Sequence, residues 1–384
     1  MQLAHLWLTD FRGHEASEVE VGPGITVFAG GNAQGKTTVL EAVGWLARMS
    51  SFRGAPDAAL VRVGCERAVV RAEIVPAHRG PDVRPDLIEA EIAAAGRNRV
   101  LLNRKPLPRV RDLLGTLRVT VFAPDDLRLV KAGPAERRAE LDELLVALSP
   151  RYDAARSDYD RVLKHRNAWL RTWSRADDPA TLDVWDEQLV RAGAELVRGR
   201  LKLLERLAAP LGKAYGDVAG APADVAGAYE AAWAGDADAD ADETRLDETR
   251  LDDVAPLLAE AVARSRSADL ERRLTLVGPH RDDWRLSIDG LDARRFASQG
   301  EQRSLALAVR LAGHVVVTDV VGEPPVLLLD DVFSELDETR ASNLVGHLPI
   351  AQALVTTAGA LPPGLPAERV VWVAGGRLEG SPRP

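Results

Sequence analysis

The chain has little of what marks secreted and membrane proteins. Cys65 is its single cysteine in 384 residues, so no disulfide can form within the chain, and a reducing, cytoplasmic compartment is expected. The N-terminal stretch has no basic flank and no long apolar core, which predicts no signal peptide. Apolar runs such as residues 315–317 and 326–329 are too short to span a bilayer, so no membrane association is expected.

An excess of positive charge is also missing. The net charge is −9, from 49 Lys and Arg against 58 Asp and Glu, which argues against a protein coated in basic surface for nucleic acid. Cysteine and histidine show no metal-ligand spacing, and no Ser-His-Asp order indicates a hydrolase triad.

Basic residues nevertheless gather in one segment, residues 97–118, which contains a single acid, Asp112. A local basic patch on an acidic protein can contact nucleic acid; the alternative is a solvated basic hairpin. The candidate DNA-contacting residues are Arg97, Arg99, Arg104, Lys105, Arg109 and Arg111. A weaker candidate lies in a helical region, where the basic residues do not keep to one helical face: Arg151, Arg156, Arg161, Lys164 and Arg166.

The strongest motif occupies residues 24–45, GITVFAGGNAQGKTTVLEAVGW. An apolar run, residues 25–29, predicts a buried strand, and apolar residues at helical spacing follow Lys36. Between them stands G-x-x-x-x-G-K-T in the strand–loop–helix context that a phosphate loop requires. Backbone N–H groups and the helix N-terminus would cradle phosphates, Lys36 would neutralise them, and the Thr37 hydroxyl would ligate Mg²⁺. The motif predicts binding of a nucleoside triphosphate.

A second motif is the apolar run at residues 325–331, PVLLLDD, which ends in two carboxylates. In a phosphate-loop protein, Asp330 would hold Mg²⁺ and Asp331 would polarise the attacking water. The alternative is a strand that runs into an acidic surface turn.

Two further stretches surround the acidic run. Residues 298–303, SQGEQR, open a strongly helical stretch, where Ser298 or Gln299 could cap the helix. Taken alone, this is an ordinary N-cap with a neighbouring glycine. Residues 334–337, SELD, directly follow the paired acids.

Periodicity places these motifs in an α/β chain with a helical insertion. Strands are predicted at residues 3–11 and 25–29, paired through a turn at residues 22–24, and at 68–75, 87–93, 99–103 and 119–122. Residues 51–64 read as a surface segment, and residues 234–249 as a flexible acidic loop. Helices are predicted at residues 134–148, 152–173, 182–207 and 254–270. Strands return at 274–278, 284–288 and 293–296, followed by helices and strands in alternation and a final hairpin at 368–380.

The order of the motifs resembles ABC-type ATPases of chromosome maintenance, with residues 298–301 as the signature and 334–337 as the D-loop. Residues 121–142, 163–170 and 276–283 narrow the resemblance to the RecF family of recombination mediators, over essentially the whole chain apart from the acidic loop. The resemblance implies an α/β ABC-type P-loop head, with a mixed sheet and an antiparallel β subdomain, and an inserted helical lobe. The expected divisions are residues 1–132, 133–270 and 271–384.

The resemblance also implies function. Family members bind ATP with Mg²⁺, dimerise when ATP is bound, and bind duplex DNA near single-strand gaps. They cooperate with RecR and RecO and promote RecA loading on SSB-coated strands, in repair, replication and the SOS response. A weak DNA-stimulated ATPase activity would be secondary to DNA binding.

Carried over residue by residue, the resemblance implies Asp331 as the catalytic acid and Thr37 with Asp330 as metal ligands. The implied ATP-binding residues are Gly30, Gly31, Asn32, Ala33, Gln34, Gly35, Lys36, Thr37 and Thr38, with Ser298, Gln299, Gly300, Glu301 and Asp337 from the partner copy or its interface. Two departures predict slow hydrolysis: the catalytic position holds Asp rather than Glu, and the switch position has Thr356-Thr357 and no His. The alternatives are an ABC subunit of another DNA-maintenance or transport complex and a small-molecule kinase. The long insertion argues against a transporter subunit, and a kinase would need neither signature nor D-loop.

Overall fold

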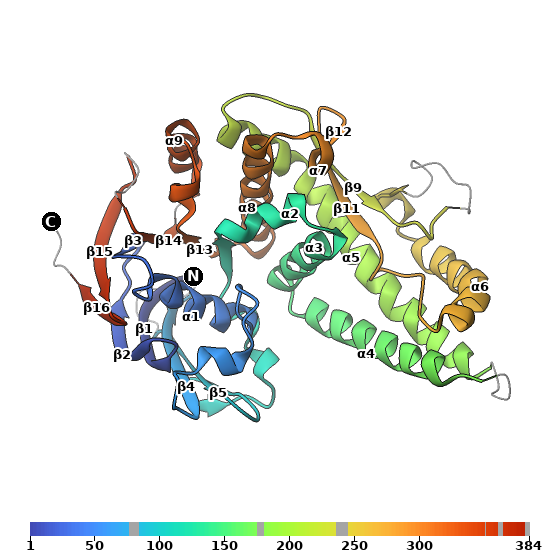
Figure 1. Cartoon of the computed structure of the whole chain (residues 1–384), viewed down its shortest axis with the longest axis horizontal. Helices are drawn as coiled ribbons and strands as arrows, with labels where there is room; N and C mark the ends of the chain where they lie inside the picture. The colour runs from blue at the N-terminus through green and yellow to red at the C-terminus, as the bar shows by residue number, and fades with distance from the viewer. Residues whose placement is uncertain (77–83, 175–179, 236–244, 350, 360–363, 381–384) are drawn as a thin grey trace. The chain divides into compact units, whose positions relative to one another are not determined.

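The computed structural model describes residues 1–76, 84–174, 180–235, 245–349, 351–359 and 364–380 (Figure 1). The chain divides into two compact units. Unit 1 comprises residues 1–126, 216–221 and 307–384, and unit 2 comprises residues 127–215 and 222–306. This division differs from the expected one, because residues 271–306 join the helical unit. The reason is strand pairing: β11 (Asp283–Ile288) pairs with β9 (Val225–Glu230) of that unit.

Unit 1 contains an antiparallel six-stranded sheet in the order β2-β1-β4-β5-β6-β7. Its strands are β1 (Gln2–Phe11), β2 (His14–Glu20), β4 (Arg67–Val75), β5 (Asp86–Ala93), β6 (Arg99–Leu102) and β7 (Lys105–Pro106). Along β4, every second residue is fully buried and faces the core. One face of the sheet therefore packs inward and the other faces solvent, as the alternating sequence predicts.

The second sheet of unit 1 has the order β16-β15-β3-β14-β13-β8 and is parallel except for β16. Its strands are β3 (Gly24–Ala29), β8 (Val119–Phe122), β13 (Val326–Asp330), β14 (Gln352–Thr357), β15 (Ala367–Ala374) and β16 (Arg377–Gly380). Every residue of β13 and β14 is buried. A parallel strand covered on both faces is expected to be a largely apolar run. Strand β13, VLLLD, follows this pattern, whereas β14, QALVTT, also buries the polar residues Gln352, Thr356 and Thr357.

Helix α1 (Lys36–Arg48) packs against both sheets, contacting β1 and β4 of the first and β8, β13 and β14 of the second. Trp45 and Leu40 of this helix are fully buried in the core. The remaining helices of unit 1 are α9 (Glu338–His347) and most of α8 (Gln299–Val321), with 3-10 turns η1 (Asp57–Leu60), η2 (Val110–Leu113), η3 (Pro124–Leu127) and η5 (Val332–Glu335).

The predicted pairing of the first strand with the residue 25–29 strand is wrong. The chain reverses at Arg12, which has φ 55°, and β1 pairs with β2 and β4, whereas β3 enters the other sheet. Strand β2, HEASEVE, is mostly polar because most of it is exposed, so its sequence gives no apolar signal.

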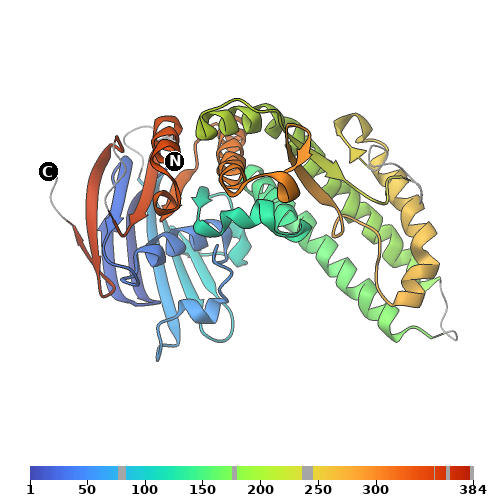
Figure 2. The same cartoon turned by 45° about the horizontal axis from the view of Figure 1, so that its top comes forward.

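Unit 2 is built on α2 (Arg128–Lys131), α3 (Pro134–Leu148), α4 (Arg151–Thr172), most of α5 (Thr181–Ala219) and α6 (Val254–Arg272), as predicted for the four longer helices. Helices α4 and α5 lie alongside each other (Figures 1 and 2). A Cβ atom at Gly199 of α5 would lie 2.6 Å from the Tyr152 ring of α4. This glycine therefore allows the close approach of the two helices.

A four-stranded sheet completes unit 2, in the order β10-β9-β11-β12, with β10 (Arg245–Leu246) and β12 (Leu291–Asp292) at its edges and the turn η4 (Glu248–Arg250) nearby. Most of the predicted acidic loop, residues 236–244, lies outside the described residues; the segment that follows forms β10 and η4 rather than loop. Residues 274–278 form a loop rather than the predicted strand. The strand predicted at residues 293–296 is instead the short helix α7 (Ala293–Phe296). Both corrections concern short segments whose conformation is set by contacts distant in sequence.

Among the described residues one helix, α8, is long and apolar enough to cross a membrane by composition, with a mean hydropathy of 1.6. The sequence expectation considered only uninterrupted apolar runs, so it did not reveal that this predicted helix has the length and composition of a membrane span. Its apolar window is 67% buried inside the protein, as in the core helix of a folded domain.

Candidate nucleotide site

The loop between β3 and α1 has two glycines that no other residue could replace. Gly30 has φ 157°, and a Cβ atom there would lie 2.3 Å from the carbonyl oxygen of Val373. Gly35 has φ 107° and serves as the N-cap of α1, with the His14 ring 2.8 Å from where its Cβ would be. The first glycine permits close approach to β15, and the second permits the left-handed turn into the helix.

Lys36 lies over this loop and is 7% exposed. Its ammonium group donates to the carbonyl oxygens of Gly30, at 2.9 Å, and Gly31, at 2.7 Å. Helix α1 begins without a side-chain cap and without an acidic residue in its first turn. Its N-terminal N–H groups and the Lys36 ammonium therefore form a positive cradle of the kind that binds phosphate.

The turn between β15 and β16 holds the phosphate loop from one side. The backbone N–H of Gly375 donates to Gln34 Oε1 at 2.8 Å, and that of Gly376 donates to the Gln34 carbonyl at 3.1 Å. Gln34 therefore fixes the loop through both its side chain and its backbone.

The β1–β2 hairpin also holds the phosphate loop. His14 Nε2 lies 3.2 Å from the Gly35 carbonyl, and Nδ1 lies 3.0 Å from Ser17 Oγ. Ser17 in turn donates to the Gly376 carbonyl at 2.9 Å. Burial lowers the pKa of His14, opposed by its bonds to backbone carbonyls. Because a carbonyl only accepts, Nε2 carries a proton in this contact.

The paired acids lie at the end of β13, next to the loop helix. Thr37 Oγ1 donates to Asp330 Oδ1 at 2.7 Å, and Thr356 Oγ1 donates to the same oxygen at 2.8 Å. Burial raises the pKa of Asp330, and the two hydroxyl bonds oppose that rise. The backbone N–H of Asp331 donates to Thr356 Oγ1 at 2.9 Å. The structure thus brings Thr37 to the consecutive acids Asp330 and Asp331, which lie 293 and 294 residues further along the chain.

The donor set at Thr37 and Asp330 suits a hard cation, since it consists of one hydroxyl and one carboxylate oxygen. Among the described residues, no group of three or more His, Cys, Asp or Glu side chains is placed to hold a metal ion. A divalent cation at this pair would take its other ligands from phosphate or water.

Sequence reasoning missed a charged network behind the loop helix. Glu41 of α1 is fully buried. Its carboxylate accepts hydrogen bonds from Arg12 Nε at 2.9 Å, from Arg12 Nη2 at 2.7 Å and from Ser51 Oγ at 2.5 Å. Arg53 lies 3.9 Å from Glu41, and its positive charge is one of the influences that oppose the burial-driven rise in the pKa of Asp330. Residues 51–64 are therefore not simply a surface segment. A buried Glu inside the loop helix was the one available signal, because such a carboxylate requires a basic partner.

The signature residues lie in unit 2 at the start of α8. Ser298 Oγ accepts from the N–H of Glu301 at 3.3 Å, and the Ser298 N–H donates to the Glu301 carboxylate at 2.7 Å. This is a capping box, so the expectation that Ser298 caps the helix is confirmed. Ser298 and Gln299 are exposed, and Gly300 and Glu301 are half-buried.

Asp337 of the D-loop stretch caps α9. Its carboxylate accepts from the backbone N–H of Arg340 at 2.9 Å and pairs with the Arg340 guanidinium. These bonds, the backbone one foremost, lower the pKa of Asp337.

The six predicted DNA-contacting residues are all exposed, on β6, β7 and the loops around them. Arg104 follows Asn103 in a tight turn where both have positive φ, and Lys105 begins β7. Arg109 pairs with Asp112 at 2.9 Å, so part of its charge is compensated.

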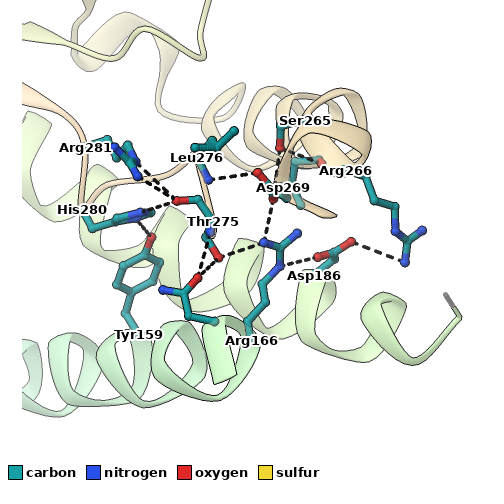
Figure 3. A network of polar contacts seen from close by, with 12 residues as sticks. Tyr159, Arg166, Asp186, Ser265, Arg266, Asp269, Thr275, Leu276, His280 and Arg281 are labelled. Atoms are coloured by element: carbon teal, nitrogen blue, oxygen red, sulfur yellow. Dashed lines mark hydrogen bonds and ion pairs between the residues drawn. The ribbon is translucent and has the colours of Figure 1, made fainter. Parts of the chain in front are cut away.

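The weaker helical candidate needs correction at Arg166, which is fully buried. Its guanidinium donates to Asp186 at 2.8 Å, Asp269 at 2.7 Å and Thr275 at 2.8 Å (Figure 3). A buried arginine engaged by two carboxylates cannot contact DNA. Its role is to tie α4 to α5, α6 and the loop that follows α6.

Comparison with known proteins now decides the family. Residues 2–358 match the family model described as RecF/RecN/SMC N terminal domain. The "DNA replication and repair protein RecF" of Frankia alni is 48% identical, covering 99% of this chain and 100% of that protein. The chain belongs to the RecF family. The RecF protein of Streptomyces avermitilis is 44% identical over 366 residues, covering 93% of this chain and 94% of that protein.

Solved structures of RecF are similar over the whole chain. A "recombination mediator protein RecF-ATPrS in RecFOR pathway" has a TM-score of 0.87 and 27% identity, covering 99% of this chain and 98% of that one. The corresponding RecF-ATP structure has a TM-score of 0.85 and 28% identity, covering 99% of each chain. The structure of an "SmcHead bound to the C-winged helix domain of ScpA" has a TM-score of 0.55 and 15% identity, covering 99% of this chain and 97% of that one. At this identity the similarity shows only that the two chains have the same fold. The predicted fold class, an α/β ABC-type P-loop head with a helical lobe, is confirmed.

Proposed function

We propose that this protein acts in DNA replication and recombinational repair as an ATP-gated, DNA-binding dimer. The observation that carries the proposal is the preformed contact of Thr37 with Asp330 beside the Lys36 cradle, within a chain of RecF sequence along its length. ATP is the proposed ligand, because the similar solved structures are of RecF with ATP and with its analogue.

The residues of unit 1 divide the nucleotide chemistry among them. The loop residues 30–38 would bind the phosphates through N–H groups, and Lys36 would exchange its two carbonyl partners for phosphate oxygens. Thr37 and Asp330 would hold Mg²⁺, whose charge stabilises the transferring phosphoryl group. Asp331 would orient the attacking water, and its short side chain favours slow hydrolysis.

Residues 298–301 and Asp337 would complete the site of a second copy, so that ATP occupancy means dimerisation. Hydrolysis would then time release from DNA, rather than drive a motor. The exposed basic segment at residues 97–111 would contact the DNA backbone without reading sequence. Binding of duplex and gapped DNA, cooperation with RecR and RecO, assistance to RecA loading, a role in the SOS response and cytoplasmic location belong to the same proposal.

The first experiment replaces Lys36 by Met and measures ATP–Mg²⁺ binding by calorimetry. We expect ATP affinity to fall at least tenfold, because the substitution removes the one ammonium group in the cradle, and ATP-dependent retention on gapped DNA to be lost with it. Lys202→Met, at an exposed position on α5, serves as the control and should bind ATP normally. Normal ATP-dependent DNA retention by Lys36→Met would overturn the coupling of the two activities.

A further inference from the structure

Unit 2 contains a cavity of about 230 Å³ whose lining is unusually rich in arginine. It lies among β9, β11, α3 and the segment just before the signature residues. The charged residues that line it are Arg137, Arg285, Arg294 and Arg295, with Glu230, Asp283 and Asp292. Four cations against three carboxylates leave a charge of +1 in the cavity.

The three carboxylates are already engaged by the two inner arginines. Arg137 is almost fully buried and donates to both Asp283 oxygens at 2.8 Å. Arg285 donates to Glu230 at 3.1 Å and to Asp292 at 3.2 Å. Because these pairs satisfy each other, the acids offer little compensation to the other two arginines.

Arg294 and Arg295 are exposed at the mouth of the cavity. Arg294 donates through Nε to the Lys131 carbonyl at 3.1 Å, which restrains its side chain. Within the described part of the chain, the Arg295 guanidinium has no hydrogen-bond or ion-pair partner. Each of these two guanidinium groups offers the planar fork of N–H donors that matches a phosphate, and both line the same cavity.

The backbone that carries these arginines is held in place. Gln302, 5% exposed and one turn inside α8, donates to the carbonyls of Ala293 at 3.1 Å and Arg294 at 3.4 Å. Asp292 also caps α7 by accepting from the Arg295 N–H at 3.0 Å. The backbone of the site is therefore preorganised, which lowers the part of the entropy cost of anion binding that would come from ordering the chain.

We propose that Arg294 and Arg295 at this cavity bind backbone phosphates of DNA, as a contact separate from the basic segment at residues 97–111. This inference rests on the proposed DNA binding. It places a DNA contact on the same segment as the signature helix, so that DNA and the signature share one rigid support in unit 2.

The test uses the full-length protein with ATP and a fluorescent 20-base-pair duplex, with anisotropy measured over a range of KCl concentrations. For Arg294→Gln/Arg295→Gln we expect at least a tenfold loss of affinity and a decrease of about two in the slope of log affinity against log salt, about one per phosphate contact. Lys202→Gln/Arg272→Gln removes the same charge from exposed positions on α5 and α6 and should leave the slope unchanged.

An unchanged slope in the double variant, while wild type binds DNA, would overturn this site and leave the proposed function standing. An equal change in the control would also overturn it, since the effect would then come from net charge. Failure of wild type to bind the duplex would overturn both. A second titration, inorganic triphosphate into the Lys36→Met protein with and without the double substitution, separates the sources of phosphate. Loss of triphosphate binding with an unchanged DNA slope would assign the cavity to free polyphosphate and overturn the DNA site.

Discussion

Thr356 supports both acids of the candidate site, a role that its sequence position did not indicate. Its hydroxyl donates to Asp330 Oδ1 and accepts from the Asp331 N–H. Sequence reasoning noted only that this switch position has no histidine. A hydroxyl between two consecutive acids can be recognised only when the neighbouring strand is in place, because Thr356 and Asp330 are paired across β14 and β13.

Replacing Thr356 by Val should weaken the site without removing a proposed ligand. Asp330 would lose one of two bonds that favour its charged form, so we expect the Mg²⁺ concentration for half-maximal ATP hydrolysis to rise roughly tenfold, for a lost bond of about 1.5 kcal/mol. Thr357→Val is the control, since among the described residues the Thr357 hydroxyl bonds only with the backbone of Gly359, just after β14. Equal Mg²⁺ requirements in both variants would contradict this role for Thr356.

His280 gives a pH dependence whose sign can be worked out. Burial lowers the pKa of His280 to about 4, so the folded ring is neutral: Nε2–H donates to the Thr275 carbonyl and Nδ1 accepts from Tyr159 (Figure 3). The unfolded state takes up a proton near pH 6.5 and the folded state does not, so stability falls as pH decreases from 6.5 toward 4.

For the change from pH 7 to pH 5, this single ring should lower the free energy of unfolding by about 2 kcal/mol. Urea unfolding at pH 7 and at pH 5 should show that His280→Gln loses about 2 kcal/mol less unfolding free energy than wild type. The His314→Gln variant provides a matched comparison for the same measurement of unfolding free energy at the two pH values, because burial also lowers the pKa of His314 to about 4. A wild-type pH dependence retained in full by His280→Gln would show that the ring does not titrate as stated.

Among the elements, those with a strong local pattern could be predicted. The fully buried β13 reads as an apolar run, and α3 to α6 follow helical periodicity. The hairpin of β1 with β2 could not, because β2 is mostly polar and exposed. In the site, the loop and the paired acids were readable from spacing, whereas the Glu41 network depends on Arg12 and Ser51 arriving from separate elements.

The β6–β7 turn is the element where the DNA prediction can be tested. Arg104 and Lys105 are exposed at its tip, so replacing both by Glu should remove phosphate contacts without disturbing the core. We expect weaker duplex binding and a salt slope smaller by about two. Lys202→Glu/Arg206→Glu makes the same charge change on exposed positions of α5 and should have less effect. An unchanged slope would leave the segment as solvated surface.

For the whole molecule, the question is whether ATP joins two copies. Ser298→Arg should preserve ATP affinity and prevent dimerisation, because its bulk and charge would enter the proposed interface. Ser298→Asn keeps a good helix cap and controls for loss of the capping box. Light scattering with ATP and Mg²⁺ should show wild type and Ser298→Asn moving from 41.5 kDa toward twice that mass, with Ser298→Arg unchanged. If ATP affinity falls as far as dimerisation in Ser298→Arg, the action on a second copy is wrong.

The support of the phosphate loop by Gly375 and Gly376 has a consequence for biosynthesis. The loop sequence is translated early, but β14 and β15, which flank the strand β3 before the loop, and the turn that bonds Gln34 come from the last part of the described chain. A nascent chain therefore displays the glycine-rich motif long before it has the cradle. We therefore expect nucleotide binding only after residue 376 has been synthesised, and copies that are clipped before the β15–β16 turn should not compete for ATP.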